Sequence, residues 1–95
     1  MIEVLEPFSH MGRRNFELYV FLGRAFQQTG QFDQAVTQYL RAISNRGYIT
    51  SVLNDLGECY VELGSLERAI WAWEKSLEMR PDQQELKQKL ENLKK

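Results

Sequence analysis

Apolar residues recur at helical spacing in five successive stretches of this chain. In the first stretch, Leu18, Leu22 and Ala25 lie four and three positions apart, which places their side chains on one face of an α-helix. Glycine, proline or short polar runs separate the stretches. We therefore predict an all-α chain, with helices at about 16–29, 33–46, 50–63, 66–80 and 83–94.

Residues that favour helix ends stand at several of these boundaries. The predicted N-caps are Asn15, Thr50, Ser65 and Asp82, the last as the first residue of a capping-box pattern. Gly30 and Gly64 suit the left-handed turn that follows a helix, and Pro81 follows the fourth helix. Pro7 and Gly12 should break any long helix nearer the N-terminus.

The apolar stripes predict which side chains form the core. In the first two helices they are Leu18, Tyr19, Leu22, Ala25, Phe26, Ala35, Val36, Tyr39, Leu40, Ala42 and Ile43. In the last three helices they are Val52, Leu53, Leu56, Cys59, Tyr60, Leu63, Ala69, Ile70, Trp73, Ser76, Leu77, Leu86, Leu90 and Leu93. We interpret Cys59 as a core residue and not as a nucleophile, because its repeat counterpart is the small residue Ala25.

One pattern occurs twice, 34 residues apart. Leu22-Gly23 returns as Leu56-Gly57. The neighbours that return in step include Tyr19 and Leu53, Phe26 and Tyr60, Gly30 and Gly64, Ala35 and Ala69, and Tyr39 and Trp73. A fixed period of this size indicates stacked repeats, in which the glycines let paired helices approach closely. One further step of 34 residues maps Gly57 to Glu91. Because the fifth helix lacks the glycine that allows close approach, we predict that no helix pairs with it and that it closes the stack.

Two stretches of the chain share one residue spacing. The first is Tyr19-x2-Leu22-Gly23-x2-Phe26 with Ala35-x3-Tyr39, and the second is Leu53-x2-Leu56-Gly57-x2-Tyr60 with Ala69-x3-Trp73. This spacing resembles the tetratricopeptide repeat. Gly47 and Leu53 depart from the family pattern, where proline and tryptophan are usual. The resemblance implies a right-handed superhelical stack of two helix-turn-helix repeats, at 16–49 and 50–83, with a C-terminal capping helix at 84–95. Residues 1–15 would form an N-terminal arm that is disordered, derived from cloning, or packed on the first helix.

Composition excludes several functions. The 95 residues are 43% hydrophobic and 26% charged, which is ordinary for one small folded domain. The net charge of -1 and scattered basic residues argue against nucleic acid. One cysteine and one histidine leave no disulfide, no metal site and no catalytic constellation, so we expect no cofactor. No long apolar run or signal pattern indicates a membrane, and a cytoplasmic location is expected.

The resemblance implies a function in protein–protein interaction, without enzymatic activity. In this family the first helix of each repeat lines a concave wall that holds a peptide or a helix. Transferred to this chain, that wall contains Glu17, Val20, Phe21, Arg24, Gln28, Asn54, Asp55, Glu58 and Glu62. The closing helix adds Glu85, Gln88, Lys89 and Asn92. Two alternatives stay open: a self-assembling structural protein, or an accessory domain of a larger enzyme.

Charges on this predicted wall allow two interpretations. Asp55, Glu58 and Glu62 share one helix face and could bind a basic peptide. More simply, neighbouring helices could pair Arg24 with Glu58, and Asp55 with Lys89. One subclass of the family grips a terminal carboxylate with lysine and asparagine at positions that here hold Val20, Arg24 and Asp55. An acid there repels a carboxylate, which argues against that subclass.

Three apolar residues fall on faces that should be open. Val20 and Phe21 lie on the predicted wall, where residues 1–14 would cover them or a partner would contact them. Trp71 lies on the outer face, where it would pack on the closing helix or anchor a partner. Two and a half repeats are few for a solenoid, so we expect this surface to be buried by self-association, by exchange of a terminal segment, or by further repeats of a longer parent.

Overall fold

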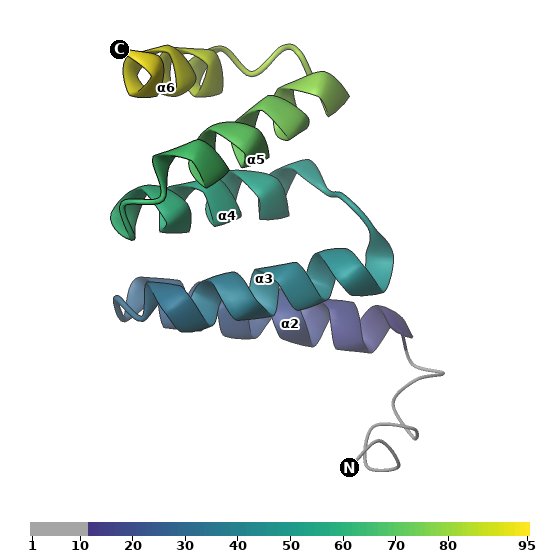
Figure 1. The fold of residues 1–95 in the computed structure, drawn as a ribbon. Helices are drawn as coiled ribbons and strands as arrows, with labels where there is room; N and C mark the ends of the chain where they lie inside the picture. The colour runs from purple at the N-terminus through teal and green to yellow at the C-terminus, as the bar shows by residue number, and fades with distance from the viewer. Residues whose placement is uncertain (1–11) are drawn as a thin grey trace.

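The computed structural model describes residues 12–95 and contains α-helices joined by short turns. They are α2 (Gly12–Gln28), α3 (Phe32–Arg46), α4 (Thr50–Glu62), α5 (Leu66–Met79) and α6 (Gln84–Lys94). Each helix packs on the next one in the chain, so that the helices stack in a row with α2 at one end and α6 at the other (Figure 1). The predicted all-helical fold, two paired units and a fifth helix, is confirmed.

The first helix begins earlier than predicted. It starts at Gly12, so Asn15 is not its N-cap, and residues 12–15 are helical where we expected an arm. Gly12 does not break the helix, because the first-turn N–H groups of a helix have no partner within the helix and glycine is tolerated there. The rest of the predicted arm, residues 1–11, lies outside the described residues.

One of the remaining predicted N-caps is confirmed by position and two are wrong. Ser65 is the N-cap of α5, although its side chain forms no capping hydrogen bond, whereas Thr50 is the first residue of α4 and follows the N-cap Ile49. Gln83, and not Asp82, is the residue before α6. The predicted turns are confirmed: Gly30 and Gly64 have φ of 81° and 80°. A β-carbon at either glycine would meet no atom within 4 Å, so the backbone conformation, not space, favours glycine.

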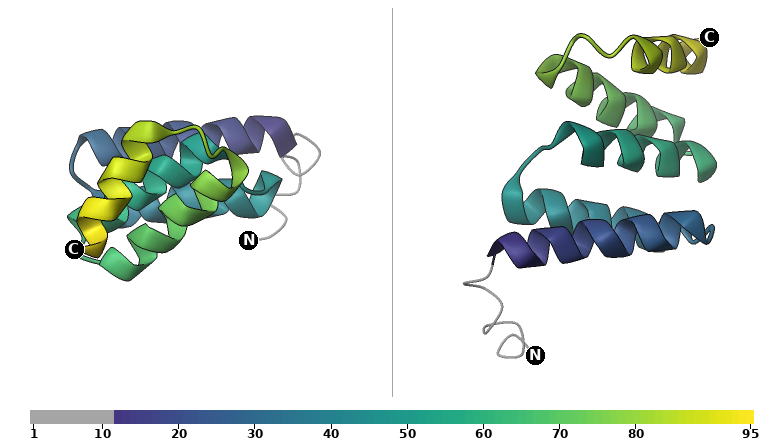
Figure 2. Two further views of the ribbon diagram at one scale, coloured as in Figure 1. Left: turned by 90° about the horizontal axis from the view of Figure 1, so that it is seen from above. Right: turned by 180° about the vertical axis from the view of Figure 1, so that it is seen from behind.

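Each helix pair is closed by an aromatic ring seated against a glycine. A β-carbon on Gly23 would lie 2.6 Å from the ring of Tyr39, and one on Gly57 would overlap the indole of Trp73. Both distances are shorter than a van der Waals contact, so these positions accept only glycine at this helix separation. The two pairs, α2 with α3 and α4 with α5, therefore repeat one packing arrangement (Figure 2).

The core lies mainly between the two pairs. Ala35, Tyr39 and Ala42 of α3 are buried, as are Val52, Leu53, Leu56, Cys59 and Tyr60 of α4. Burial of Cys59 confirms its interpretation as a core residue. A second cluster joins Trp73 of α5 to Leu86 and Leu90 of α6. The opposite side of α6 is exposed and polar, as predicted for a closing helix.

Four residues of the predicted core are exposed. Leu18 and Ala25 of α2 are open, whereas their repeat counterparts Val52 and Cys59 are buried. The difference arises because α4 packs on the preceding α3, and no described helix precedes α2. Leu40 and Leu63 are also exposed, because they lie at the edges of their apolar stripes.

Candidate functional site

Two neighbouring hollows run along the side of the stack formed by α2, α4 and α6. The first, of about 420 Å³, is lined by Arg24, Gln27, Gln28, Phe32, Asp55, Glu58 and Glu62. The second, of about 390 Å³, is lined by Asn54, Glu58, Trp73, Asp82, Gln83, Gln84, Glu85, Leu86 and Lys89. Glu58 borders both hollows, so they adjoin at this residue, and we call the two hollows together the α4 groove.

Ion pairs cross the α4 groove between successive helices. Arg24 Nε lies 3.5 Å from Asp55 Oδ2, and Lys89 Nζ lies 3.0 Å from Glu58 Oε2. Gln27 Nε2 also donates a hydrogen bond to Glu58 Oε1, at 3.5 Å. The charges are therefore paired, as one of our two interpretations expected, but Arg24 pairs with Asp55 instead of Glu58, and Lys89 with Glu58 instead of Asp55.

The spacing of these contacts explains the different pairing. Gln27 and Lys89 each bond Glu58 from 31 residues away, and Arg24 and Asp55 have the same separation. This separation is three residues shorter than the 34-residue period. A residue on the first helix of one repeat therefore contacts the equivalent helix of the next repeat about one turn away from its own repeat counterpart. The residue numbers alone do not predict this shift, because it depends on how the helices lie relative to one another in space.

Asp55 occupies the most buried part of this charged surface. Burial raises the pKa of its carboxyl, Arg24 lowers that pKa, and the neighbouring Glu58 raises it again. The net effect is a raised pKa, so the ion pair with Arg24 does not fully offset the loss of water around Asp55. The ionised form of Asp55 is thus held at a cost in stability.

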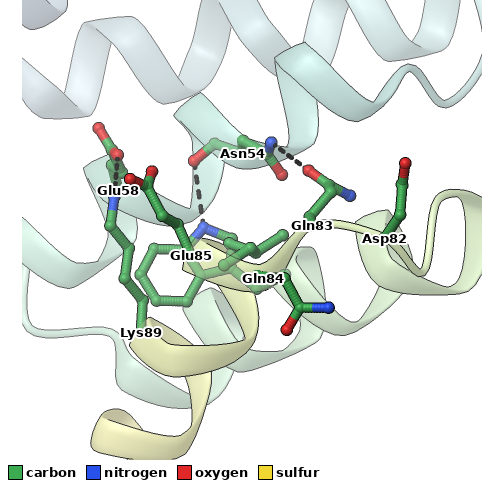
Figure 3. Close-up of a pocket in the computed structure, with 9 residues that line it drawn as sticks. Asn54, Glu58, Asp82, Gln83, Gln84, Glu85 and Lys89 are labelled. Atoms are coloured by element: carbon green, nitrogen blue, oxygen red, sulfur yellow. Dashed lines mark hydrogen bonds and ion pairs between the residues drawn. The ribbon is translucent and has the colours of Figure 1, made fainter.

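The other wall of the groove is fixed by hydrogen bonds around Gln83 (Figure 3). Asn54 Nδ2 donates to Gln83 Oε1 at 2.9 Å, and Gln83 Nε2 donates to the buried Ser76 Oγ at 3.0 Å. The indole nitrogen of Trp73 donates to the backbone oxygen of Asn54 at 3.1 Å. These bonds connect α4, α5 and the start of α6, and they hold the groove in one shape.

The structure brings most of the predicted wall together, but not all of it. The predicted residues that line the groove are Arg24, Gln28, Asn54, Asp55, Glu58 and Glu62. Glu17, Val20 and Phe21 line neither hollow. Val20 is half-buried and packs against the core, so it is less open than expected. Phe21 is 67% exposed.

Several groove residues were absent from the prediction. Asp82 and Gln83 come from the turn between α5 and α6 and Gln84 begins α6, while Phe32 begins α3 and Trp73 belongs to α5. The prediction takes the wall only from the first helix of each repeat and from four residues of the closing helix. The polar run after Pro81 was the available signal, since a turn entering a closing helix lies beside the wall.

Trp71 lies away from the groove. Its ring meets Tyr48, in the turn between α3 and α4, edge to face with centroids 5.9 Å apart. Trp71 therefore packs against this turn, whereas we expected it either to pack on the closing helix or to anchor a partner. Lys75 Nζ lies 5.4 Å from the other ring of this pair, Tyr48. Trp71 remains exposed in part, and a role as a partner anchor stays a prediction.

Helix pairs that recur with a fixed sequence period, each closed by a ring on a glycine, define a helical-repeat protein. The family model of the tetratricopeptide repeat matches residues 16–47 and 50–83, and the chain belongs to this family. A comparison with curated proteins finds no match. Within the described residues, no helix is long and apolar enough to cross a membrane, and no group of side chains is suited to hold a metal ion.

Proposed function

We propose that this chain is a non-enzymatic interaction module that holds a peptide segment or a helix of a partner protein in the α4 groove. Tetratricopeptide repeats are generally protein-interaction modules, which supports a protein partner. The observation that carries the proposal is the pair of adjoining hollows across α2, α4 and α6, which are lined mainly by charged and amide side chains. Hydrogen bonds of Gln83 with Asn54 and Ser76 connect the walls of the second hollow, which supports a shape that exists before a ligand binds.

The charge of the groove indicates the chemistry of the ligand. Its two cations, Arg24 and Lys89, are both bound to carboxylates of the groove itself. Five acidic residues line the two hollows: Asp55, Glu58, Glu62, Asp82 and Glu85. Acids exceed bases by three, and this excess favours a ligand with lysine or arginine side chains.

Two of these acids are available without breaking an internal bond. Glu62 lies beside the α2–α4 hollow and Glu85 beside the α4–α6 hollow, and both are exposed. Within the described part of the chain, neither forms an ion pair. Asp55 and Glu58, by contrast, would have to exchange a pairing with Arg24 or Lys89. We therefore propose that Glu62 and Glu85 make the main contacts with basic groups of the ligand.

A displayed library of random peptides tests this function. Peptides retained by the full chain are expected to be enriched in lysine and arginine, and their binding should weaken as salt rises. Glu62→Lys is expected to raise the Kd of a retained peptide at least about tenfold. The matched control is Glu91→Lys, an exposed residue of α6 outside the groove that changes net charge equally, and it should change the Kd less than about twofold.

Two results would contradict the proposal. Retained peptides without basic enrichment would remove the acidic groove as the source of selectivity. Equal losses from Glu62→Lys and Glu91→Lys would show that overall charge, and not the groove, attracts the peptide.

The alternative of self-association is favoured by a different observation, the exposed apolar side of α2. That surface does not overlap the two hollows.

A further inference from the structure

The two ends of the stack differ in chemistry. At the N-terminal end, Leu18, Phe21, Leu22 and Ala25 form one stripe along α2, which we call the N-terminal face. Leu18 is 52% exposed and Phe21 is 67% exposed. At the C-terminal end, the exposed side of α6 contains Lys87, Gln88, Glu91 and Asn92. An apolar end and a polar end do not complement each other, so copies of this chain would not join head to tail.

The residues at the same positions one repeat later show that such a stripe can be buried in an interface between helices. Val52, Leu56 and Cys59 are the counterparts of Leu18, Leu22 and Ala25, and all three are buried where α4 packs against α3. The N-terminal face therefore has the shape and apolar character of an internal helix interface. In the described chain it lacks a covering helix.

Phe21 distinguishes the N-terminal face from the equivalent surfaces inside the stack. Its counterpart Asp55 of α4 reaches back to Arg24 of α2, and the next counterpart, Lys89 of α6, reaches back to Glu58 of α4. Both times, a charge at this position is matched by an opposite charge on the first helix of the repeat before it. Phe21 replaces that charge with a large apolar ring, so an ordinary preceding repeat, with a charged residue there, would leave its own charge unpaired.

We propose that the N-terminal face is a dimerisation surface, on which a second copy of this chain packs its own α2 in antiparallel orientation about a two-fold axis. Residues close to such an axis meet the same residues of the other copy. A charge there would repel its own kind, whereas an aromatic ring does not, and this accounts for Phe21 in place of a charged residue.

The stripe is also self-complementary in size. With the axis between Phe21 and Leu22, antiparallel helices place Leu18 level with the partner's Ala25, and the two copies of Phe21 lie next to each other beside the axis. Each bulky residue at the ends of the stripe then faces a small one. Residues 1–11 are a competing cover, but Pro7 interrupts a continuous helix of the kind that α3 provides over the matching side of α4.

Analytical ultracentrifugation of the full 11.2 kDa chain, from micromolar to millimolar concentration, tests the proposal. We expect a reversible dimer of twice that mass. Phe21→Glu is expected to raise the dimer dissociation constant at least about tenfold. Because Phe21 is exposed, circular dichroism should show unchanged helicity. The control is Leu66→Glu, which places the same charge at another exposed apolar residue (43%) and should leave the dimer intact.

A mixing experiment tests the symmetry. Phe21→Glu and Phe21→Lys should each be monomeric alone, and an equimolar mixture should restore the dimer, because position 21 lies next to its own copy across the axis. A mixture that stays monomeric while the unaltered chain dimerises would overturn the proposed axis.

A full chain that is monomeric at every concentration would overturn the dimer itself, and a thiol probe then identifies the cover. In a Phe21→Cys variant, slow maleimide labelling would assign the cover to residues 1–11. Fast labelling would leave the face open to a different protein. Either outcome leaves the peptide-binding test of the α4 groove unaffected, since that test uses another surface.

Discussion

The indole of Trp73 lies against the backbone of Gly57 so closely that a β-carbon at position 57 would overlap it. Its ring nitrogen donates a hydrogen bond to the backbone oxygen of Asn54, at 3.1 Å. Tyr39 occupies the same place on Gly23, and its hydroxyl donates to Gln27 Oε1 at 2.6 Å. In both repeats, a glycine provides the space and a hydrogen bond fixes the ring in it.

This arrangement predicts that Gly57→Ala destabilises the fold. Alanine favours a helix over glycine by about 1 kcal/mol, but the new methyl group must displace the Trp73 ring. Overpacking of this kind costs roughly 1–3 kcal/mol or more, and separating the indole from Asn54 removes a hydrogen bond as well. We expect the free energy of unfolding in urea to fall by at least about 1 kcal/mol.

Gly30→Ala provides the comparison for this prediction. A β-carbon there meets nothing within 4 Å, and the cost comes only from φ of 81°. That strain amounts to about 1–2 kcal/mol and leaves the helix contact unaltered. If Trp73→Leu is made first, the penalty of Gly57→Ala should shrink, while that of Gly30→Ala should not. A Gly57→Ala variant as stable as the unaltered chain would contradict the close packing inferred here.

Most of the fold could be predicted because it depends on short, repeated spacing. Apolar residues at helical intervals located the helices, and the 34-residue period identified Gly23, Gly57 and Cys59 as packing positions. These features are set by neighbours within one repeat. The exposure of Leu18 and Ala25 is different, because it depends on whether another helix precedes α2.

The candidate site was less predictable because its contacts join different helices. Helical periodicity places Arg24 and Asp55 on the correct faces, but the one-turn shift that pairs them depends on how α2 and α4 lie relative to each other in space. The sequence pattern places Gln83 only in a capping box, whereas its side chain forms hydrogen bonds with Ser76 and Asn54. Long polar side chains choose partners by distance in space, and sequence spacing does not give that distance.

The hydrogen bonds of Gln83 give a second prediction. Its amide accepts from Asn54 and donates to the side chain and backbone of Ser76, a residue with no exposed surface. Gln83→Ala leaves these groups unpaired, which costs roughly 1–3 kcal/mol. Because the bonds connect α5 to the start of α6, hydrogen exchange should accelerate mainly in α6.

The neighbouring glutamine is the matched control. Gln84 is exposed, and Gln84→Ala should change the free energy of unfolding by less than about 0.5 kcal/mol. Equal effects of the two substitutions on exchange in α6 would mean that helix propensity at this turn, and not the Gln83 bonds, fixes the closing helix.

Cys59 gives a third prediction, concerning thiol reactivity. Its side chain is fully buried, and burial, followed by the nearby Asp55, Glu58 and Glu62, raises its pKa to about 12. The thiolate is the reactive form, so maleimide labelling at pH 8 should proceed only as fast as the fold opens. In denaturant the same thiol should label within the mixing time.

An exposed cysteine in the same helix calibrates this measurement. Ser51→Cys, at an exposed position of α4, should label at once in the folded chain and bring the total to one reactive thiol per molecule. Labelling of Cys59 in the unaltered folded chain at a comparable rate would show that the interface between α3 and α4 opens readily.

The fourth prediction concerns Asp55 and pH. Burial, only partly offset by Arg24, raises its pKa above the ordinary value of 3.8, and Glu58 adds to the rise. A group with a raised pKa binds more protons in the folded state than in the unfolded state. Its contribution to the free energy of unfolding is therefore complete below pH 3.8 and is lost as pH rises through the folded pKa.

Asp55→Asn removes this titration while keeping the shape of the side chain. At pH 7 the variant should be more stable than the unaltered chain, by up to about 1 kcal/mol, and the difference should vanish near pH 3, where Asp55 is protonated in both states. Urea unfolding across this range measures it. Glu62→Gln, which removes an exposed carboxylate from the same groove, is the matched control. If Asp55→Asn instead loses stability at pH 7, the ion pair with Arg24 outweighs the burial of the carboxylate, and the groove is held together by charge.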